Sequence, residues 1–99
     1  MRTYETLLLL SPELNDSERA TVVDLLRSTI ERENGSVVTV DDWGMRDLAY
    51  PVKKVMRGWY LRIEYGLQPL AVQELERIIR LNENIFKFIT VKLADAVAA

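Results

Sequence analysis

Two pairs of carboxylates, Asp41-Asp42 and Glu74-Glu76, are the candidates for acid-base chemistry in this sequence. General acid-base catalysis needs a carboxyl group whose proton affinity is raised by burial or by a neighbouring charge. The first pair lies in a polar turn and the second on the exposed side of an amphipathic helix, so neither is expected in such an environment. The chain has no histidine and no cysteine, which removes the commonest general base, the thiol nucleophile and the usual zinc ligands. We therefore expect no catalytic site, no metal and no cofactor.

Positive charge is concentrated in one part of the chain. Residues 1–42 carry four basic and nine acidic side chains, whereas residues 46–62 carry five basic side chains against one acidic side chain. The net charge of −2 argues against a protein that holds nucleic acid by its overall charge, so any contact with phosphates must be local. The alternative is a solvated basic hairpin, which is common on soluble surfaces, and charge alone does not decide between the two interpretations.

The segment 57–65 invites comparison with the third-strand octet of RNA-recognition-motif domains, which begins with a basic residue, glycine and an aromatic residue. The match fails further on, because Tyr60, Arg62 and Glu64 stand where that octet has a small residue, valine and an aromatic. The strict alternation of apolar residues over residues 59–65 also places Trp59 on the face of the strand that packs into the core. We therefore interpret Trp59 as a core residue and not as a base-stacking platform.

The first half of the chain predicts strand, helix and strand. Residues 3–10 are almost all apolar or β-branched, which is typical of a central strand buried on at least part of both faces. Asn15 and Glu18 have the spacing of a capping box, and an apolar stripe then predicts a helix over residues 16–33, which ends at Asn34-Gly35 as a left-handed stop. Residues 36–51 predict one long strand with a bend or bulge near Gly44.

The second half predicts strand, helix and strand again. Pro51 places the end of the long strand at a sheet edge or outside the ladder, and a basic loop follows. Alternation predicts a strand over residues 59–65, and an apolar stripe after Pro69 predicts a helix over residues 69–81. Residues 85–93 predict the last strand, with Ile85, Ile89, Val91 and Leu93 on one side.

The order βαββαβ predicts an α+β, ferredoxin-like fold. Right-handed crossovers place both helices on one face of a four-stranded antiparallel sheet and leave the other face open. We expect a single domain over residues 1–93 and a short frayed tail over residues 94–99. The longest apolar runs are far shorter than the roughly 20 residues that span a bilayer, and no secretory signal precedes them, so we expect a cytoplasmic protein.

The open face is predicted to bind a partner protein. If the last strand has the phase given above, Phe86, Phe88 and Lys92 lie on the open face beside Tyr60 and Arg62 of the preceding strand. Two exposed phenylalanines would form an apolar patch, and such patches usually mark binding surfaces. The competing interpretation is that the strand has the opposite phase, and the lone Lys87 decides only weakly between the two.

The segment from Asp42 to Val52, which reads DWGMRDLAYPV, closely resembles the signature of the S-six family, the sixth protein of the bacterial small ribosomal subunit. The opening residues 1–5, the segment 58–60 and the residues 84–85 and 91–92 are also similar to that family. The resemblance covers residues 1–93. It implies a ferredoxin-like fold and a non-enzymatic ribosomal protein that binds small-subunit ribosomal RNA as a heterodimer with the eighteenth small-subunit protein, with no membrane and no small-molecule substrate.

The resemblance also suggests residues for each contact. Arg2 and Arg46 are the first choices for RNA contact, and Lys53, Lys54, Arg57 and Lys92 follow. Tyr50 and Tyr60 are candidates for the partner-protein interface, together with the predicted open-face residues Arg62, Phe86 and Phe88. The chain departs from the family at Asp47, where a second basic or polar residue is frequent, so the charge of this segment is weaker or Asp47 pairs with Arg46 or with an arginine of the partner.

Two other classes of protein share the fold. A regulatory or ligand-binding module would need an apolar pocket at a subunit boundary and would form a stable homodimer. An enzyme of the acylphosphatase kind would need an arginine-bearing phosphate loop between the first strand and the first helix. Residues 11–16 of this chain form an acidic segment there, which would repel phosphate.

Overall fold

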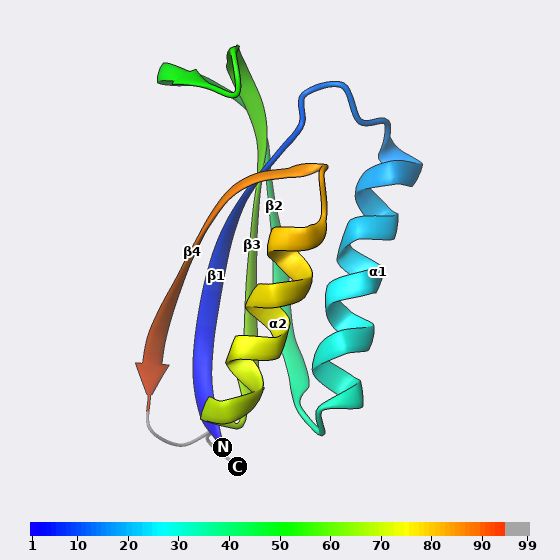
Figure 1. The fold of residues 1–99 in the computed structure, drawn as a ribbon, viewed down its shortest axis with the longest axis vertical. Coiled ribbons are helices and arrows are strands. Elements are labelled where there is room, and N and C mark those ends of the chain that lie inside the picture. The colour runs from blue at the N-terminus through cyan, green and yellow to red at the C-terminus, as the bar shows by residue number, and fades with distance from the viewer. Residues whose placement is uncertain (95–99) are drawn as a thin grey trace.

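Six elements form one four-stranded antiparallel sheet with two helices on the same side of it (Figure 1). The computed structural model describes residues 1–94. The strands lie in the order β2-β3-β1-β4, so β1 and β3 are central and β2 and β4 are the edges. The elements are β1 (Arg2–Leu10), α1 (Asp16–Arg32), β2 (Ser36–Val52), β3 (Val55–Leu67), α2 (Pro69–Leu81) and β4 (Ile85–Ala94). The predicted order and the α+β, ferredoxin-like architecture are confirmed. The predicted tail covers residues 94–99, of which residues 95–99 lie outside the described residues.

The core lies between the sheet and the helices. Alternate residues of β1 and β3 face the helices, as the register pairs Leu8 with Leu61 and Tyr4 with Tyr65. From the helices, Leu26 and other apolar side chains of α1 and α2 complete the same cluster. The predicted phase of β3 is therefore confirmed, because residues 59, 61, 63 and 65 all pack on this side and Tyr60, Arg62 and Glu64 point to the open face.

Tyr65 carries a polar group into the core. Its ring is fully buried, and its hydroxyl lies 2.9 Å from the Thr6 hydroxyl, which in turn lies 3.0 Å from that of Thr90. Burial raises the pKa of the Tyr65 phenol above 10.0, and the hydrogen bond with Thr6 opposes part of that increase. The hydroxyl chain satisfies polar groups that would otherwise be costly to bury.

The Tyr65→Phe substitution is expected to lower the free energy of unfolding at neutral pH by about 1 kcal/mol, because it removes one buried hydrogen bond. In the native protein the folded state keeps Tyr65 neutral while the unfolded chain ionises near pH 10, so stability falls as pH rises above 10. The variant should lose less stability than the native protein between pH 10 and 11. Urea unfolding at both pH values measures the difference, and parallel losses in the two proteins would contradict the assignment.

Helix α1 begins at the predicted capping box, and at its C-terminal end the left-handed conformation belongs to one residue of the predicted Asn34-Gly35 pair. Asn15 and Glu18 form the predicted capping box, since each side chain accepts from the other residue's backbone N–H. At the other end the left-handed residue is Asn34, with φ of 65°, and not Gly35. Gly35 is required for a different reason, because a Cβ there would lie 2.4 Å from the Gly66 carbonyl oxygen.

The β2–β3 hairpin is longer and tighter than expected. The predicted basic loop is a two-residue turn at Lys53-Lys54, and the strands continue up to Val52 and resume at Val55. Both lysines have positive φ, 48° and 67°, as in a type I′ turn. The predicted irregularity near Gly44 is confirmed, because Asp42 pairs with Leu61 and Gly44 with Tyr60, which leaves Trp43 as an extra residue in a β-bulge.

The predicted phase of β4 is wrong beyond its first residue. Leu10 pairs with Ile85 and Leu9 with Lys87, so Phe86 is the extra residue of a bulge. A one-residue shift moves every later side chain to the other face of the sheet. Phe88 therefore pairs with Leu8 and packs against the core, and Lys92 shares that side, while Lys87, Ile89 and Val91 face the open side.

Candidate nucleic-acid interface

Five basic residues gather at one end of the molecule and are called the basic hairpin here: Arg46, Lys53, Lys54, Arg57 and Lys87. Four of them belong to the tip of the β2–β3 hairpin, which projects beyond the rest of the sheet at the top of Figure 1. All five are exposed. The acidic residue within the hairpin, Asp47, lies opposite Arg57 on the neighbouring strand and pairs with it at 3.3 Å, and not with Arg46. The group therefore keeps a clear excess of positive charge.

Lys87 is the member that the sequence analysis missed. Its Nζ donates a hydrogen bond of 3.0 Å to the Tyr50 hydroxyl and lies 5.4 Å from the centre of that ring. This contact raises the pKa of Lys87 and lowers the pKa of the Tyr50 phenol, because the ammonium and the phenolate stabilise each other. Only the bulge at Phe86 turns Lys87 to this face, and nothing in the sequence pattern marks that bulge.

The predicted RNA-contact residues do not form one group. Arg46, Lys53, Lys54 and Arg57 lie together, but Arg2 and Lys92 lie at the other end of the sheet. Arg2 pairs with Leu67 at the far end of β3, and Lys92 pairs with Tyr4. The two groups lie towards opposite ends of the long axis of the molecule (Figure 1). A single RNA surface at the hairpin would include four of the six predicted residues.

The turn lysines occupy backbone positions that suit other residues better. Positive φ costs an ordinary residue roughly 1–2 kcal/mol, and Asn-Gly is the preferred pair for a type I′ turn. The double substitution Lys53→Asn with Lys54→Gly is therefore expected to raise the free energy of unfolding by about 1 kcal/mol. Urea denaturation followed by circular dichroism measures it, and a less stable variant would contradict the turn geometry.

The open face has a hollow of about 240 Å³ beneath the hairpin. Tyr50 and Tyr60, the two tyrosines predicted at the partner interface, both line it, so the structure brings them together. The rest of the lining is Lys87 and four apolar residues: Leu7, Leu9, Phe88 and Ile89. Its lining is thus aromatic and aliphatic with one charge at the rim, which is typical of a surface that receives another molecule.

An apolar strip continues from this hollow along the edge strand β4. Ile89 is 54% exposed and Val91 is 45% exposed, and both face the open side. Neither was proposed from the sequence, because the predicted phase placed them in the core. Phe88 packs on the helix side instead, where the Arg80 guanidinium lies 5.3 Å from its ring centre, and Phe86 lies at the bulge with Lys53 5.8 Å from its ring.

Arg62 occupies the centre of the open face, where it pairs with Glu5 of β1, Asp41 of β2 and Glu64 of its own strand. The distances to Asp41 and Glu64 are both 2.9 Å. Hydrogen bonds to Glu64 and Glu5 raise the pKa of Arg62 further above its usual value. One positive charge thus stands among three carboxylates, and the cluster keeps a net charge of −2. This part of the face favours a positively charged partner over RNA.

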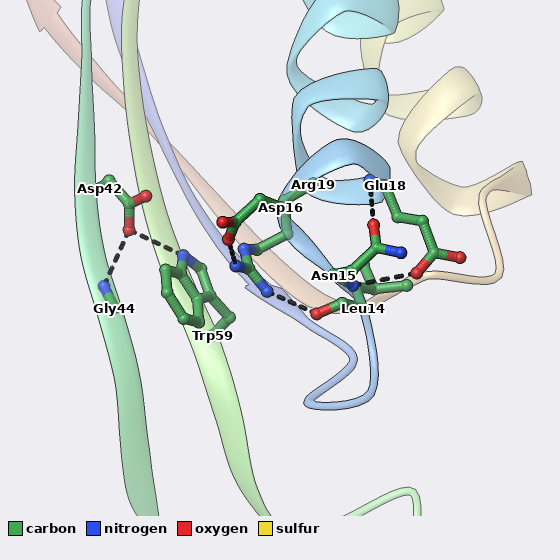
Figure 2. A network of polar contacts seen from close by, with 8 residues as sticks. All are labelled: Leu14, Asn15, Asp16, Glu18, Arg19, Asp42, Gly44 and Trp59. Carbon is green, nitrogen blue, oxygen red and sulfur yellow. Dashed lines mark hydrogen bonds and ion pairs between the residues drawn. The ribbon is translucent and has the colours of Figure 1, made fainter.

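The bulge in β2 is tied to the rest of the fold by a network of polar contacts (Figure 2). The Asp42 carboxylate accepts hydrogen bonds from the backbone N–H of Gly44 at 3.0 Å and from the Trp59 indole at 2.7 Å. The guanidinium of Arg19 lies over the Trp59 ring, 3.6 Å from its centre, and donates to the Leu14 carbonyl oxygen. Two strands and the start of α1 therefore hold the segment that leads into the basic hairpin.

The described residues offer little for other chemistry. No cluster of three or more acidic, histidine or cysteine residues that could hold a metal is found within residues 1–94. In the same part of the chain, no helix is long and apolar enough to cross a membrane.

Comparison with known proteins gives a consistent result. The family model described as ribosomal protein S6 matches residues 3–92. The small ribosomal subunit protein bS6 of Nitratidesulfovibrio vulgaris is 61% identical over 97 residues, which are 98% of this chain and 96% of that protein. That of Desulfovibrio desulfuricans is 61% identical over 99 residues, covering 99% of this chain and 96% of that protein.

Solved structures agree with this family. The crystal structure of 30S ribosomal protein S6 from Thermotoga maritima matches with a TM-score of 0.87 at 30% identity, over 93% of this chain and 87% of that chain. The C-terminal domain of the MgtC protein from Mycobacterium tuberculosis matches with a TM-score of 0.62 at 12% identity and shares the fold alone. The chain belongs to the ribosomal protein S6 family and is a structural, non-enzymatic component of the small ribosomal subunit in the bacterial cytoplasm.

Proposed function

We propose that the chain binds small-subunit ribosomal RNA through the basic hairpin and does so as a heterodimer with the eighteenth small-subunit protein. The main support for the RNA contact is that Lys53 and Lys54 occupy the two turn positions of the hairpin. Two lysines stand at a tight turn where Asn-Gly would be less strained, which indicates that their charge is kept for binding. Phosphate contacts from lysine and arginine supply the sequence-independent part of RNA affinity.

The partner has a separate place on the open face. The hollow under the hairpin and the exposed strip of Ile89 and Val91 offer apolar surface, and the Arg62 cluster beside them is acidic overall. A basic partner with an apolar contact segment complements both features. Tyr50, Tyr60, Arg62 and Phe86 remain proposed members of this interface. Arg2 and Lys92 remain proposed RNA contacts at the opposite end of the sheet. Phe88 packs against the core and only borders the hollow that the partner is proposed to cover.

The RNA contact is tested with the hairpin variant that carries Lys53→Asn and Lys54→Gly. Because it is expected to be more stable than the native chain, a loss of affinity cannot come from unfolding. Filter binding of the heterodimer to the central domain of small-subunit RNA should show a loss of about tenfold and a shallower salt dependence, since two phosphate contacts disappear. A double substitution on α1, Arg27→Gln with Arg32→Gln, removes the same charge elsewhere and should leave affinity nearly unchanged. Equal losses in the two variants would contradict a localised RNA surface.

The partner contact is tested with Ile89→Arg. A new charge on the apolar strip should abolish heterodimer formation, measured by titration calorimetry, and with it the gain in RNA affinity that the partner gives. Leu70→Arg is the matched control, because Leu70 is 86% exposed on α2, away from the open face. If the chain binds RNA equally well with and without the partner, the two binding events are not coupled. The proposal that the heterodimer is the RNA-binding form is then wrong, even if the chain binds both RNA and the partner.

A further inference from the structure

Trp43 is a large aromatic side chain that the fold does not use in its core. It is 45% exposed, whereas the other tryptophan, Trp59, packs against the core cluster. As the extra residue of the β2 bulge, Trp43 has no counterpart on β3. Bulges commonly redirect a side chain towards a ligand. The exposure of this indole therefore calls for an explanation outside the packing of the chain itself.

The backbone that carries Trp43 is held on both sides. Asp42, directly before it, bonds to the Trp59 indole and to the N–H of Gly44, directly after it (Figure 2). Gly44 has φ of 81°, which allows the sharp turn that other residues resist. The Arg19 guanidinium lies over the Trp59 ring. The backbone of so constrained a segment loses little further entropy when its side chain binds a ligand.

Arg46 bonds to the backbone of the same bulge. Its Nε donates a hydrogen bond of 3.0 Å to the Trp43 carbonyl oxygen, which holds the guanidinium next to the bulge. Among the ion pairs found within residues 1–94, none involves Arg46, and the nearby Asp47 is paired with Arg57. The terminal nitrogens of Arg46 are thus available to a phosphate, which guanidinium groups bind with paired hydrogen bonds.

We propose that Trp43 and Arg46 form a site for one unpaired RNA nucleotide, in which the base stacks on the indole and the adjacent phosphate binds the guanidinium. This inference rests on the proposed RNA-binding function and adds a base-stacking contact to it. Single-stranded nucleotides in folded RNA are typically recognised by an aromatic platform with a neighbouring arginine. An RNA ligand is favoured over a protein here because a cation with no ion pair among residues 1–94 is bonded to the backbone of Trp43. The other large apolar or aromatic side chains of β2 that are exposed, Val38 and Tyr50, lie five or more residues away along the strand.

The test pairs protein variants with altered RNA. In filter binding by the heterodimer, Trp43→Ala should weaken binding to the RNA central domain about tenfold, and Trp43→Phe should restore most of the loss because a smaller ring still stacks. The melting temperature of Trp43→Ala should change by less than about 3 °C, since the site is half exposed. Arg46→Gln should weaken binding, and Arg46→Lys should recover it only in part.

Abasic substitution then identifies the nucleotide. Each unpaired position of the RNA is replaced in turn by an abasic residue, and one of them should weaken native binding by the same factor as Trp43→Ala. With that RNA, Trp43→Ala should cause no further loss, because the stacked base is already gone. If Trp43→Ala binds intact RNA as well as the native chain, the nucleotide site is overturned while the basic hairpin remains. If Trp43→Ala instead weakens the heterodimer in the absence of RNA, the indole contacts the partner and the inference is also overturned.

Failure of the proposed RNA-binding function would give a different result in the same filter-binding experiment. If neither the native heterodimer nor any variant binds the RNA, the proposed function itself is wrong. If the native heterodimer binds and the Lys53→Asn, Lys54→Gly variant is weakened, the function holds and the result for Trp43 alone decides the present inference.

Discussion

The Gly35→Ala substitution is expected to lower the free energy of unfolding by about 3 kcal/mol, at the upper end of the usual cost of overpacking. A Cβ at this position would lie 2.4 Å from the Gly66 carbonyl oxygen and 2.7 Å from a side-chain carbon of Leu67. The carbonyl belongs to β3, where Gly66 pairs with Ser36, so it cannot move without breaking the sheet ladder. For a domain of this size the melting temperature should fall by roughly 12–20 °C.

Asn34→Gly is the matched control for this prediction. Asn34 is the residue with positive φ at the end of α1, and glycine adopts that conformation without strain. Its replacement should change the free energy of unfolding by less than about 0.5 kcal/mol. Thermal unfolding of both variants separates the two roles. If Asn34→Gly were the more destabilising change, the close approach of residue 35 to Gly66 of β3 would not be the reason for the glycine.

The sequence was sufficient for the fold because its local signals agree with one another. Asn15 and Glu18 mark the start of α1, Pro69 marks the start of α2, and the alternation over residues 59–65 gives the buried face of β3 correctly. Each of these signals acts within a few residues and does not depend on the rest of the molecule. The order of elements and the side of the sheet that the helices cover follow from them.

The errors arise where a single inserted residue changes the register. Phe86 is accommodated as a bulge opposite β1, so the apolar residues Ile85 and Ile89 face opposite sides although their spacing predicts one side. Periodicity alone cannot locate such a bulge, because the sequence 85–93 is apolar on both faces. The same shift hides Lys87 from the candidate site and assigns Phe88 to the wrong face.

Contacts between residues far apart in the sequence could not be predicted from it either. Arg62 meets Glu5, which is 57 residues away, and Asp41, which is 21 residues away. Only the three-dimensional register of β1, β2 and β3 brings these charges together. The two-residue turn is also not evident from the sequence, since lysine pairs are atypical of type I′ turns and the segment predicts a longer loop.

Replacing Arg62 with methionine is expected to lower the free energy of unfolding by about 2 kcal/mol. Methionine keeps much of the length of the side chain, so the main change is the loss of the positive charge. Glu5 and Glu64 lie directly opposite each other on β1 and β3, and like charges at such positions repel. The estimate is reduced for solvent screening, because the carboxylates are 25–45% exposed and can regain water. Added salt should narrow the gap between variant and native protein.

A second substitution shows whether the effect is electrostatic. In the native protein, Glu5→Gln removes a partner of Arg62 and should destabilise the fold. In the Arg62→Met variant the same change removes one of three repelling carboxylates and should stabilise it. The sign of the Glu5→Gln effect therefore reverses between the two backgrounds, and a double-mutant cycle in urea measures the reversal. If Glu5→Gln destabilises both proteins equally, packing and not charge accounts for the role of Arg62, and the acidic surplus proposed to attract a basic partner loses its support.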